Sequence, residues 1–383
     1  MKRFVVLCIL FAAVPFAHAD VSMTDAQTLA RAGNGNRAAS SVAGHVVKPG
    51  DKRNGIPLGT VRPDSTGAQS LVDASGLKYF INTDITFSTS SSASGAMSEA
   101  SYTHAVAATT SAGGTVQETL NDAFDGYNAV CVSLDNTVST CATGNANFVV
   151  YDKNGPATLD ATCSNRQVLL PAQTIGSISL SRKVYIPTDD SFGRWLNVVT
   201  NNGATAQTVT LVTSNNLGSD ANTIITGSST GSTTSPITDT SEKWVATFQN
   251  YSGNTTTDPR LGHVLQGAGA AVGLAGINFT NGSDRPFWGY TLTLQPGQTR
   301  IIMNFVTGQP SKAAAATQAA RLATLPSTTL ECMTSAEKAA VANFNAAPAA
   351  PATPVPGPDP LKLALLALLL VALGYLGLRA RAR

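Results

Sequence analysis

Apolar and polar residues alternate in short runs along most of the chain, which is the pattern of half-buried β-strands. In residues 207–214, Val209 and Leu211 fall on one side of an extended chain, and Thr208 and Thr210 fall on the other. Similar runs, rich in Thr, Val, Ile and aromatic residues, are separated by clusters of Asn, Gly, Asp and Ser. They predict strands at 77–88, 178–187, 194–201, 207–214, 242–249, 290–294 and 299–306.

The connections between these runs predict an antiparallel arrangement. Residues 294–299 carry a Pro-Gly turn and residues 200–205 carry an Asn-Gly turn, so each is expected to join two strands as a hairpin. No helical period interrupts the strands, which favours a sandwich over an α/β sheet. We therefore predict a mainly β fold, with a large antiparallel β-sandwich at 76–308.

The period of the apolar positions changes after the last predicted strand. Residues 310–326 are rich in Ala, with Ser311 as the helix cap and Pro326 as the stop, while Thr334 and Glu337 have the spacing of a capping box. These signals predict two short closing helices within 309–345, with a flexible linker as the alternative for the Ala-rich run.

Two further segments have little periodicity. Residues 20–75 are poor in aromatic residues and are predicted to form an irregular N-terminal arm, with one short strand at 42–47. Residues 346–360 are rich in Pro and Ala and are predicted to be a linker.

Both ends of the chain carry export patterns. Residues 1–19 combine a basic start, an apolar run and Ala-His-Ala, which predicts a signal peptide cleaved between Ala19 and Asp20; a buried helix is the alternative. Residues 361–383 contain an apolar run and a basic end, which predicts one transmembrane helix with its arginines on the cytoplasmic side. These arginines are Arg379, Arg381 and Arg383.

The C-terminal segment resembles the PEP-CTERM and IPTL-CTERM sorting signals of Gram-negative bacteria, which share a Pro-containing motif, one helix and an Arg-rich end. Val355 and Pro356 match the Ile-Pro opening of the IPTL motif, but residues 357–362 do not reproduce its usual Thr-Leu and Trp-Gly. The resemblance implies anchoring in the inner membrane during transit and processing by a sortase-like enzyme. An ordinary single-span anchor is the alternative.

The charges are unevenly distributed. The chain has 25 basic and 23 acidic residues, and six of the basic ones lie in the two terminal segments, which leaves residues 20–360 with 19 basic and 23 acidic residues. Such a body lacks the excess of basic residues that is typical of nucleic-acid binding, so we expect no nucleic-acid partner.

Four cysteines remain once Cys8 is removed with the signal peptide, and an even number in an exported chain predicts two disulfides. Of the three possible pairings we favour Cys131 with Cys141, because they flank an Asp-Asn turn. Cys163 and Cys332 would then connect the sandwich to the closing helices. The sequence contains no Cys-x-x-Cys spacing, so the cysteines do not have the pattern of a metal site.

Few residues carry a pattern of catalytic chemistry, and we predict no catalytic residue and no metal site. The histidines of the exported part, His45, His104 and His263, lack the spacing of a zinc hydrolase. Residues 227–231 match the Gly-x-Ser-x-Gly nucleophile elbow, but no helical pattern follows them, so we expect a hairpin loop.

Asp122 and Asp125 are the ligand candidates, because one turn could hold both carboxylates. Calcium uses such oxygen clusters, although it normally takes six or more ligands, and a glycosidase uses paired carboxylates; a turn that accepts backbone N–H bonds is the favoured alternative. Trp288 is the best candidate for an exposed aromatic that stacks on a sugar, although packing is favoured over binding for it as well, and Trp195 and Trp244 lie within strand patterns and are expected in the core.

Residues 120–345 resemble a β-sandwich module of secreted bacterial surface proteins. The matching motifs are Arg-Lys-Val-Tyr-x-Pro at 182–187, Leu-Gly-Ser-Asp at 217–220 and His-x-x-Gln-Gly at 263–267. The resemblance implies a module without an established activity, and only analogy extends it to a super-sandwich of the mutarotase-like kind.

These features predict an exported protein of the cell envelope or the extracellular space with a structural or adhesive role. They favour a non-enzymatic role over an enzymatic one. Its expected partners are the inner membrane, a sortase-like enzyme and extracellular polysaccharide or surface components. The alternative is a carbohydrate-binding or carbohydrate-active protein on the same sandwich.

Overall fold

The computed structural model describes eight stretches of the chain, which all belong to the first of its two compact units, residues 1–346. The predicted signal peptide, the strand at 42–47 and the C-terminal tail lie outside the described residues. Within the described residues, no helix is long and apolar enough to cross a membrane. The described stretches are 52–53, 56–57, 68–83, 94–110, 112–141, 146–152, 157–249 and 257–346.

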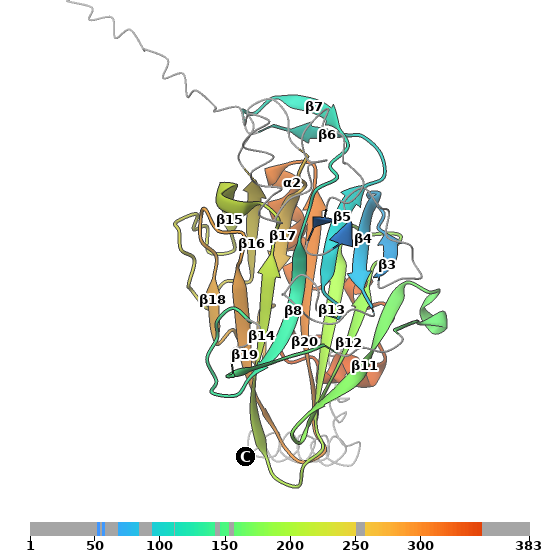
Figure 1. Cartoon of the computed structure of the whole chain (residues 1–383), viewed down its shortest axis with the longest axis vertical. Helices are drawn as coiled ribbons and strands as arrows, with labels where there is room; N and C mark the ends of the chain where they lie inside the picture. Colours follow the sequence, from blue (N-terminus) through green and yellow to red (C-terminus); the bar gives the residue numbers. More distant parts are fainter. Residues whose placement is uncertain are drawn as a thin grey trace, which may run out of the picture. The chain divides into compact units, whose positions relative to one another are not determined.

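Two eight-stranded antiparallel sheets make up most of the described body (Figure 1). In strand order, sheet I consists of β10 (Thr158–Leu159), β11 (Gln167–Ile175), β12 (Ile178–Tyr185), β13 (Gly193–Asn201), β20 (Thr299–Gln309), β17 (Arg260–Val264), β16 (Trp244–Gln249) and β15 (Thr223–Ser228). Sheet II consists of β18 (Gly276–Asn278), β19 (Phe287–Leu294), β14 (Gln207–Asn216), β8 (Gly126–Ser133), β5 (Met97–Tyr102), β4 (Leu77–Asn82) and β3 (Ala68–Val72), with β9 (Phe148–Val150) paired to β8.

Two short ribbons accompany the sheets, β1 (Lys52–Arg53) with β2 (Ile56–Pro57) and β6 (Val106–Thr109) with β7 (Thr115–Glu118). The mainly β, antiparallel prediction is confirmed, and each predicted strand segment contains an observed strand. Strand β3 lies within the segment that we predicted as an irregular arm, so sheet II begins before residue 76. Its five residues are too few to show a clear alternation of apolar and polar positions.

Both predicted hairpins, at 200–205 and 294–299, are wrong in their pairing. The turns do form, and Gly297 has the positive φ of +73° that a Pro-Gly turn requires. However, β13 and β20 belong to sheet I, whereas β14 and β19 belong to sheet II. Each turn therefore carries the chain from one sheet to the other. A tight turn reverses the chain in either case, so its sequence does not reveal which sheet the next strand joins.

The two crossing turns are bonded to each other at the lower end of Figure 1. The Asn201 side-chain amide donates to the Leu294 carbonyl (3.0 Å), and the Gly297 N–H donates to the Asn201 carbonyl (2.8 Å). These contacts fix the two sheets face to face at this end.

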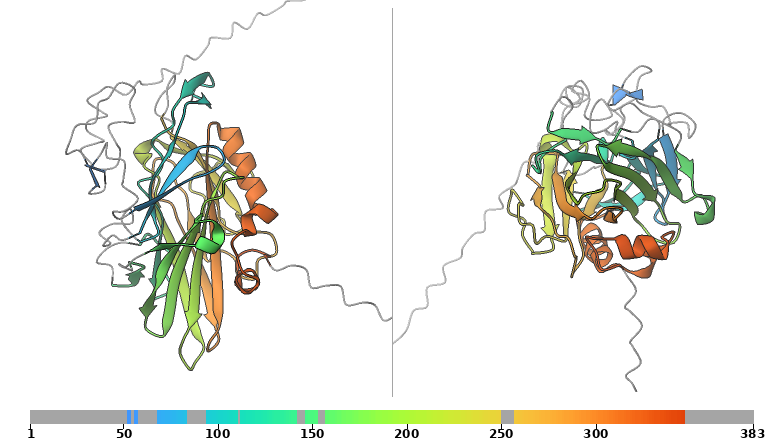
Figure 2. Two further views of the ribbon diagram at one scale, coloured as in Figure 1. Left: turned by 90° about the vertical axis from the view of Figure 1, so that its right-hand side faces the viewer. Right: turned by 90° about the horizontal axis from the view of Figure 1, so that it is seen from below.

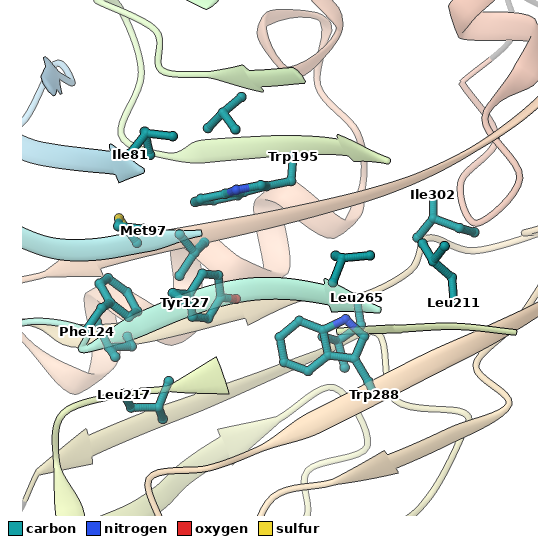
Figure 3. Packing of buried hydrophobic residues seen from close by; sticks show 14 of the residues in the cluster. Ile81, Met97, Phe124, Tyr127, Trp195, Leu211, Leu217, Leu265, Trp288 and Ile302 are labelled. Carbon is teal, nitrogen blue, oxygen red and sulfur yellow. The ribbon is translucent and has the colours of Figure 1, made fainter. Parts of the chain in front are cut away.

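The main hydrophobic core lies between the sheets and contains large aromatic side chains from both (Figure 3). Strand β20 shows how sheet I is buried on both faces. Ile302 belongs to this core, whereas the adjacent Ile301 and Met303 belong to a second cluster on the outer face of sheet I. The alternation of side chains along a strand places successive residues in different layers.

The two predicted closing helices are α2 (Lys312–Ala323) and α3 (Ser335–Ala340), and both predicted caps are present. The Ser311 hydroxyl accepts from the Ala314 N–H (3.1 Å), and Thr334 and Glu337 form the capping box. Helix α2 packs on β15, β16, β17 and β20, so it covers the outer face of sheet I (Figure 2). The short 3₁₀ turns are η3 (Ala161–Cys163), η4 (Asp220–Asn222) and η5 (Ser327–Leu330).

Both predicted disulfides are confirmed. Cys131 on β8 is bonded to Cys141, with Cα atoms 6.1 Å apart, although the returning strand β9 begins only at Phe148. Cys163 in η3 is bonded to Cys332 after η5, with Cα atoms 5.4 Å apart. The second bridge joins the first strands of sheet I to the segment between the two helices.

Candidate functional site

The two predicted ligand residues, Asp122 and Asp125, are enclosed just before β8. Their exposed fractions are 2% and 0%. The Asp122 N–H donates to the Thr257 carbonyl (3.2 Å) and the Asp125 N–H donates to the Asn216 carbonyl (3.0 Å). The Asp125 carboxyl group packs against Gly218, where an added Cβ would lie 3.3 Å from its Cγ atom. Neither carboxyl group faces solvent.

The carboxyl groups of this turn do not share an open site. Asp122 lines a cavity of about 10 Å³ together with Asp258, which has room for about one water molecule, and Asp125 is not part of its wall. Among the described residues, no group of three or more His, Cys, Asp or Glu side chains could hold a metal ion. The arrangement therefore resembles neither a glycosidase cleft nor a calcium loop.

Trp288 is fully buried, so it packs in the core, as favoured, and is not a surface for sugar stacking. Its ring stacks on Phe279, with centroids 5.9 Å apart and planes inclined by 4°, and a second ring contact is made with Tyr127. Trp288, Tyr290 and Leu292 alternate along β19 and all face the core (Figure 3 shows Trp288). Trp195 is also fully buried, as predicted.

His263 is fully buried, and both of its ring nitrogens have hydrogen-bond partners. Nε2 lies 2.9 Å from the Thr247 hydroxyl, and Nδ1 lies 3.1 Å from the Tyr127 hydroxyl. Burial lowers the pKa of His263 to about 3, because the interior disfavours the charged ring. A neutral, fully enclosed histidine joins strands and has no access to a substrate.

The Gly-Ser-Ser-Thr-Gly segment forms the loop that we predicted and no nucleophile elbow. Strand β15 ends at Ser228, and the chain returns through a loop to β16, with no helix directly after the serines. The Ser229 hydroxyl donates to the Glu242 carboxylate (2.6 Å) and accepts from the Lys243 N–H (2.6 Å). Ser229 therefore holds the base of the β15–β16 loop together.

A cavity of about 550 Å³ lies on the outer side of sheet I, where the end of α2 meets the start of β16. Its wall includes Lys243 and Trp244 of the β16 segment, Ala320 and Leu325 of the α2 segment, and Phe344 near the end of the described chain. This volume lies within the range of small-molecule sites, and the cavity is open to solvent on one side. We call it the α2–β16 cavity.

Small residues create the hollow and hold its aromatic side chains in place. A Cβ atom on Gly267 would lie 2.7 Å from the Phe344 ring, so that ring can only lie where it does because residue 267 has no side chain. A Cβ atom on Gly227 would lie 3.6 Å from the Trp244 ring, so the indole rests on this glycine. Ala320 on α2 leaves open the space above them.

Leu325 lines the cavity in a backbone conformation that favours glycine. Its φ is +59°, and its N–H donates to the Leu322 carbonyl at the end of α2 (3.0 Å). A side chain in this left-handed region costs about 1 kcal/mol relative to glycine. Such strained positions concentrate at functional sites. Here the strain coincides with a side chain on the cavity wall.

The cavity has a positive electrostatic character. Lys243 is the only charged side chain among the described residues that line it. The neighbouring Glu242 is fully buried and accepts from the Ser229 hydroxyl, the Thr230 N–H (3.1 Å) and the Thr230 hydroxyl (2.5 Å). The Glu242 carboxylate is thus bonded within the loop, and Lys243 forms no ion pair with another residue of the described part of the chain.

Sequence reasoning did not find this site. Trp244 was predicted in the core, yet it is half-buried and lines the cavity. Phe344 lies in the segment 309–345 that was predicted to form the closing helices, but α3 ends at Ala340. The lining residues come from segments that lie far apart in the sequence, so no local sequence motif indicates that they form one site.

No protein-family model matches the chain, and no curated protein matches it. Solved structures with some likeness include a TPR-domain-containing protein from Parabacteroides distasonis (TM-score 0.38, 11% identity, 62% of this chain and 46% of that chain). A polysaccharide lyase is a second example (TM-score 0.34, 14% identity, 64% of this chain and 34% of that chain). A third is a galactose mutarotase-like protein from Lactobacillus casei (TM-score 0.34, 8% identity, 63% of this chain and 99% of that chain). The chain spans less than half of the first two proteins. At these TM-scores and identities, the likenesses assign neither a family nor an activity.

Proposed function

We propose that this is an exported β-sandwich protein with a structural or adhesive role in the cell envelope or outside the cell. The observation that carries the proposal is the pair of disulfides, Cys131–Cys141 and Cys163–Cys332, in a chain whose start has the pattern of a signal peptide. Disulfides form and persist in oxidising compartments outside the cytoplasm.

The burial of the candidate reactive groups supports a role other than catalysis. Asp122, Asp125 and His263 are all enclosed, and Ser229 is engaged within its loop. A general acid or base must come within hydrogen-bond reach of a substrate, which these enclosed groups do not offer. The sandwich is held instead by an extensive shared core, as a structural module requires.

The two ends complete the proposal. Residues 1–19 would be removed between Ala19 and Asp20 during export. Residues 361–383 would anchor the chain in the inner membrane until a sortase-like enzyme releases or relocates the body to the cell surface or beyond. Extracellular polysaccharide or other surface components would then be the partners of the body.

The proposal is tested by producing the full chain in a Gram-negative host, fractionating the cells and measuring the intact mass. We expect a species that lacks residues 1–19, has no free thiol in the body and sediments with membranes. A variant without residues 361–383 should appear in the soluble exported fraction. A variant without residues 1–19, as the control, should stay in the cytoplasm with free thiols. An uncleaved N-terminus, four free thiols or unchanged fractionation of the tail deletion would contradict the proposal.

A second candidate function is carbohydrate binding, and the α2–β16 cavity is the observation that favours it. The half-buried Trp244 offers a ring surface beside polar groups in a hollow of suitable size. A binding role of this kind is compatible with adhesion, since an adhesive surface protein also needs a ligand.

A further inference from the structure

We propose that the α2–β16 cavity binds a sugar ring that carries a carboxylate, such as a uronic acid unit of a polysaccharide. The inference rests on the carbohydrate-binding candidate function. It adds to that function the place of the site, the charge of the ligand and the residues that recognise it.

The size and shape of the cavity set the class of ligand. About 550 Å³ accommodates one or two sugar rings, and the side that is open to solvent allows a polysaccharide chain to continue outward. The walls come from β16, α2 and the segment around Phe344, and α2 is packed firmly on sheet I. A site on such elements is largely formed before the ligand arrives, which reduces the ordering cost of binding.

The Trp244 side chain favours a ring over a flexible ligand, and the buried Phe344 supports the cavity wall. Trp244 is half-buried and rests on Gly227, so the indole is held in place. Phe344 is buried against Gly267. The C–H face of a pyranose ring packs on a flat apolar surface such as the Trp244 ring, while its hydroxyl groups remain free to form hydrogen bonds.

Polar groups at the edge of the cavity suit the hydroxyl groups of a sugar. The Thr324 hydroxyl donates to the Arg321 carbonyl (2.7 Å), so its oxygen can still accept a hydrogen bond. Asn345 is exposed at the rim, and its side-chain amide can both donate and accept. A hydroxylated ring can form hydrogen bonds with these exposed groups, whereas an acyl chain has no group to do so.

Lys243 determines the charge of the ligand. It is half-exposed, and no ion pair within the described part of the chain engages its ammonium group. No carboxylate among the described residues lines the cavity, because Glu242 is bonded to Ser229 and Thr230. A ligand carboxylate would supply the missing negative charge and form a charge-assisted hydrogen bond with Lys243.

The test is calorimetric titration of the mature full-length protein with trigalacturonic acid and, separately, with a neutral trisaccharide of the same length. We expect the acidic sugar to bind more tightly. Lys243→Gln should weaken the binding of the acidic sugar about fivefold or more and leave the neutral sugar unaffected. Lys338→Gln, on α3 and outside the cavity wall, is the matched control and should change neither affinity.

A second variant tests the place of the site independently of charge. Ala320→Phe should fill the cavity from the α2 side and abolish binding of both sugars, with the unfolding temperature as the check on folding. If this variant does not fold, Trp244→Leu tests the same site from the β16 side, because it removes the ring on which a sugar would pack and should weaken binding of both sugars. Unchanged sugar binding by a folded cavity variant would overturn the assignment of the site.

The outcomes separate the inference from the function on which it rests. Equal affinities for the acidic and neutral sugars, with no effect of Lys243→Gln, would overturn the inference and leave carbohydrate binding standing. Binding of neither sugar would overturn both. The export and envelope role would be untouched by either result, because fractionation tests it separately.

Discussion

Arg182 shows how single residues hold the two sheets together without ion pairs. It is fully buried, and burial lowers the pKa of its guanidinium group to about 10. Its Nε donates to the Asn197 side chain (2.9 Å), its Nη1 to the Ser94 carbonyl (2.9 Å) and its Nη2 to the Asn128 carbonyl (2.7 Å). These neutral acceptors belong to three separate segments, so one charged side chain connects both sheets.

Asp73 and His263 make opposite contributions to stability below neutral pH. Burial raises the pKa of Asp73 to about 6, so the folded state binds a proton more readily than the unfolded state, and stability falls as pH rises from 3.8 to about 6. His263 has a folded pKa of about 3 against an ordinary value of 6.5, so its contribution is lost as pH falls from 6.5 towards 3. Because the two trends have opposite signs over overlapping pH ranges, the stability of the wild-type protein as a function of pH shows only their sum.

We expect a His263→Gln variant to reveal the histidine contribution. The difference in the free energy of unfolding between wild type and variant should grow with pH by about 1.4 kcal/mol per unit between pH 3 and 6.5, and be constant above. Urea unfolding at several pH values measures this difference. His104→Gln is the matched control, because His104 is exposed. A difference that does not vary with pH would contradict the explanation.

At the scale of elements, the contact between α2 and β17 depends on the absence of side chains. Residue 262 on β17 is a glycine, and a Cβ atom there would lie 2.8 Å from the Ala315 carbonyl and 2.9 Å from the Ala319 Cβ. The alanines of α2 therefore do more than favour a helix. They let the helix lie directly on sheet I and shape the cavity at its far end.

We expect Gly262→Ala to destabilise the protein by about 1–3 kcal/mol, because one extra methyl group would push the helix away from the sheet. Gly114→Ala is the control, since its Cβ would meet the Thr110 hydroxyl only at 3.4 Å and its effect should stay within about 0.5 kcal/mol. Both values are measured by denaturant unfolding. Equal effects of the two substitutions would show that α2 can shift without cost.

At the scale of the whole molecule, the two disulfides differ in the length of chain that they close. Cys163–Cys332 joins residues 169 apart and spans most of sheet I, whereas Cys131–Cys141 joins residues 10 apart, from β8 of sheet II to the segment that follows it. In the chain-entropy description, a longer closed loop restricts the unfolded chain more strongly. The bridge near the helices should therefore contribute more to stability.

We expect a double Ala variant at Cys163 and Cys332 to lose about 2 kcal/mol more stability than a double Ala variant at Cys131 and Cys141. Each double variant is the control for the other, because both remove one buried bridge. Thermal unfolding under oxidising conditions measures the two losses. A larger loss from the short bridge would mean that local packing around Cys131, and not chain entropy, dominates.

The sequence by itself determined the local structure of this protein. The alternation of Thr and Val marked the strands, Ser311 and the Thr334–Glu337 pair marked the starts of both helices, and an even set of cysteines around a turn indicated both bridges. These features depend on neighbours within a few residues, so they can be read from a single chain.

Only the tertiary structure decided which surfaces meet. The turn after Leu294 leads into the other sheet, Trp288 faces the core, and the α2–β16 cavity combines residues as distant as Lys243 and Phe344. An alternating pattern shows that a strand has two faces but does not show what covers each of them. What covers each face depends on packing between segments far apart in the sequence. Such packing fills the space around Trp288 and leaves a cavity beside Trp244.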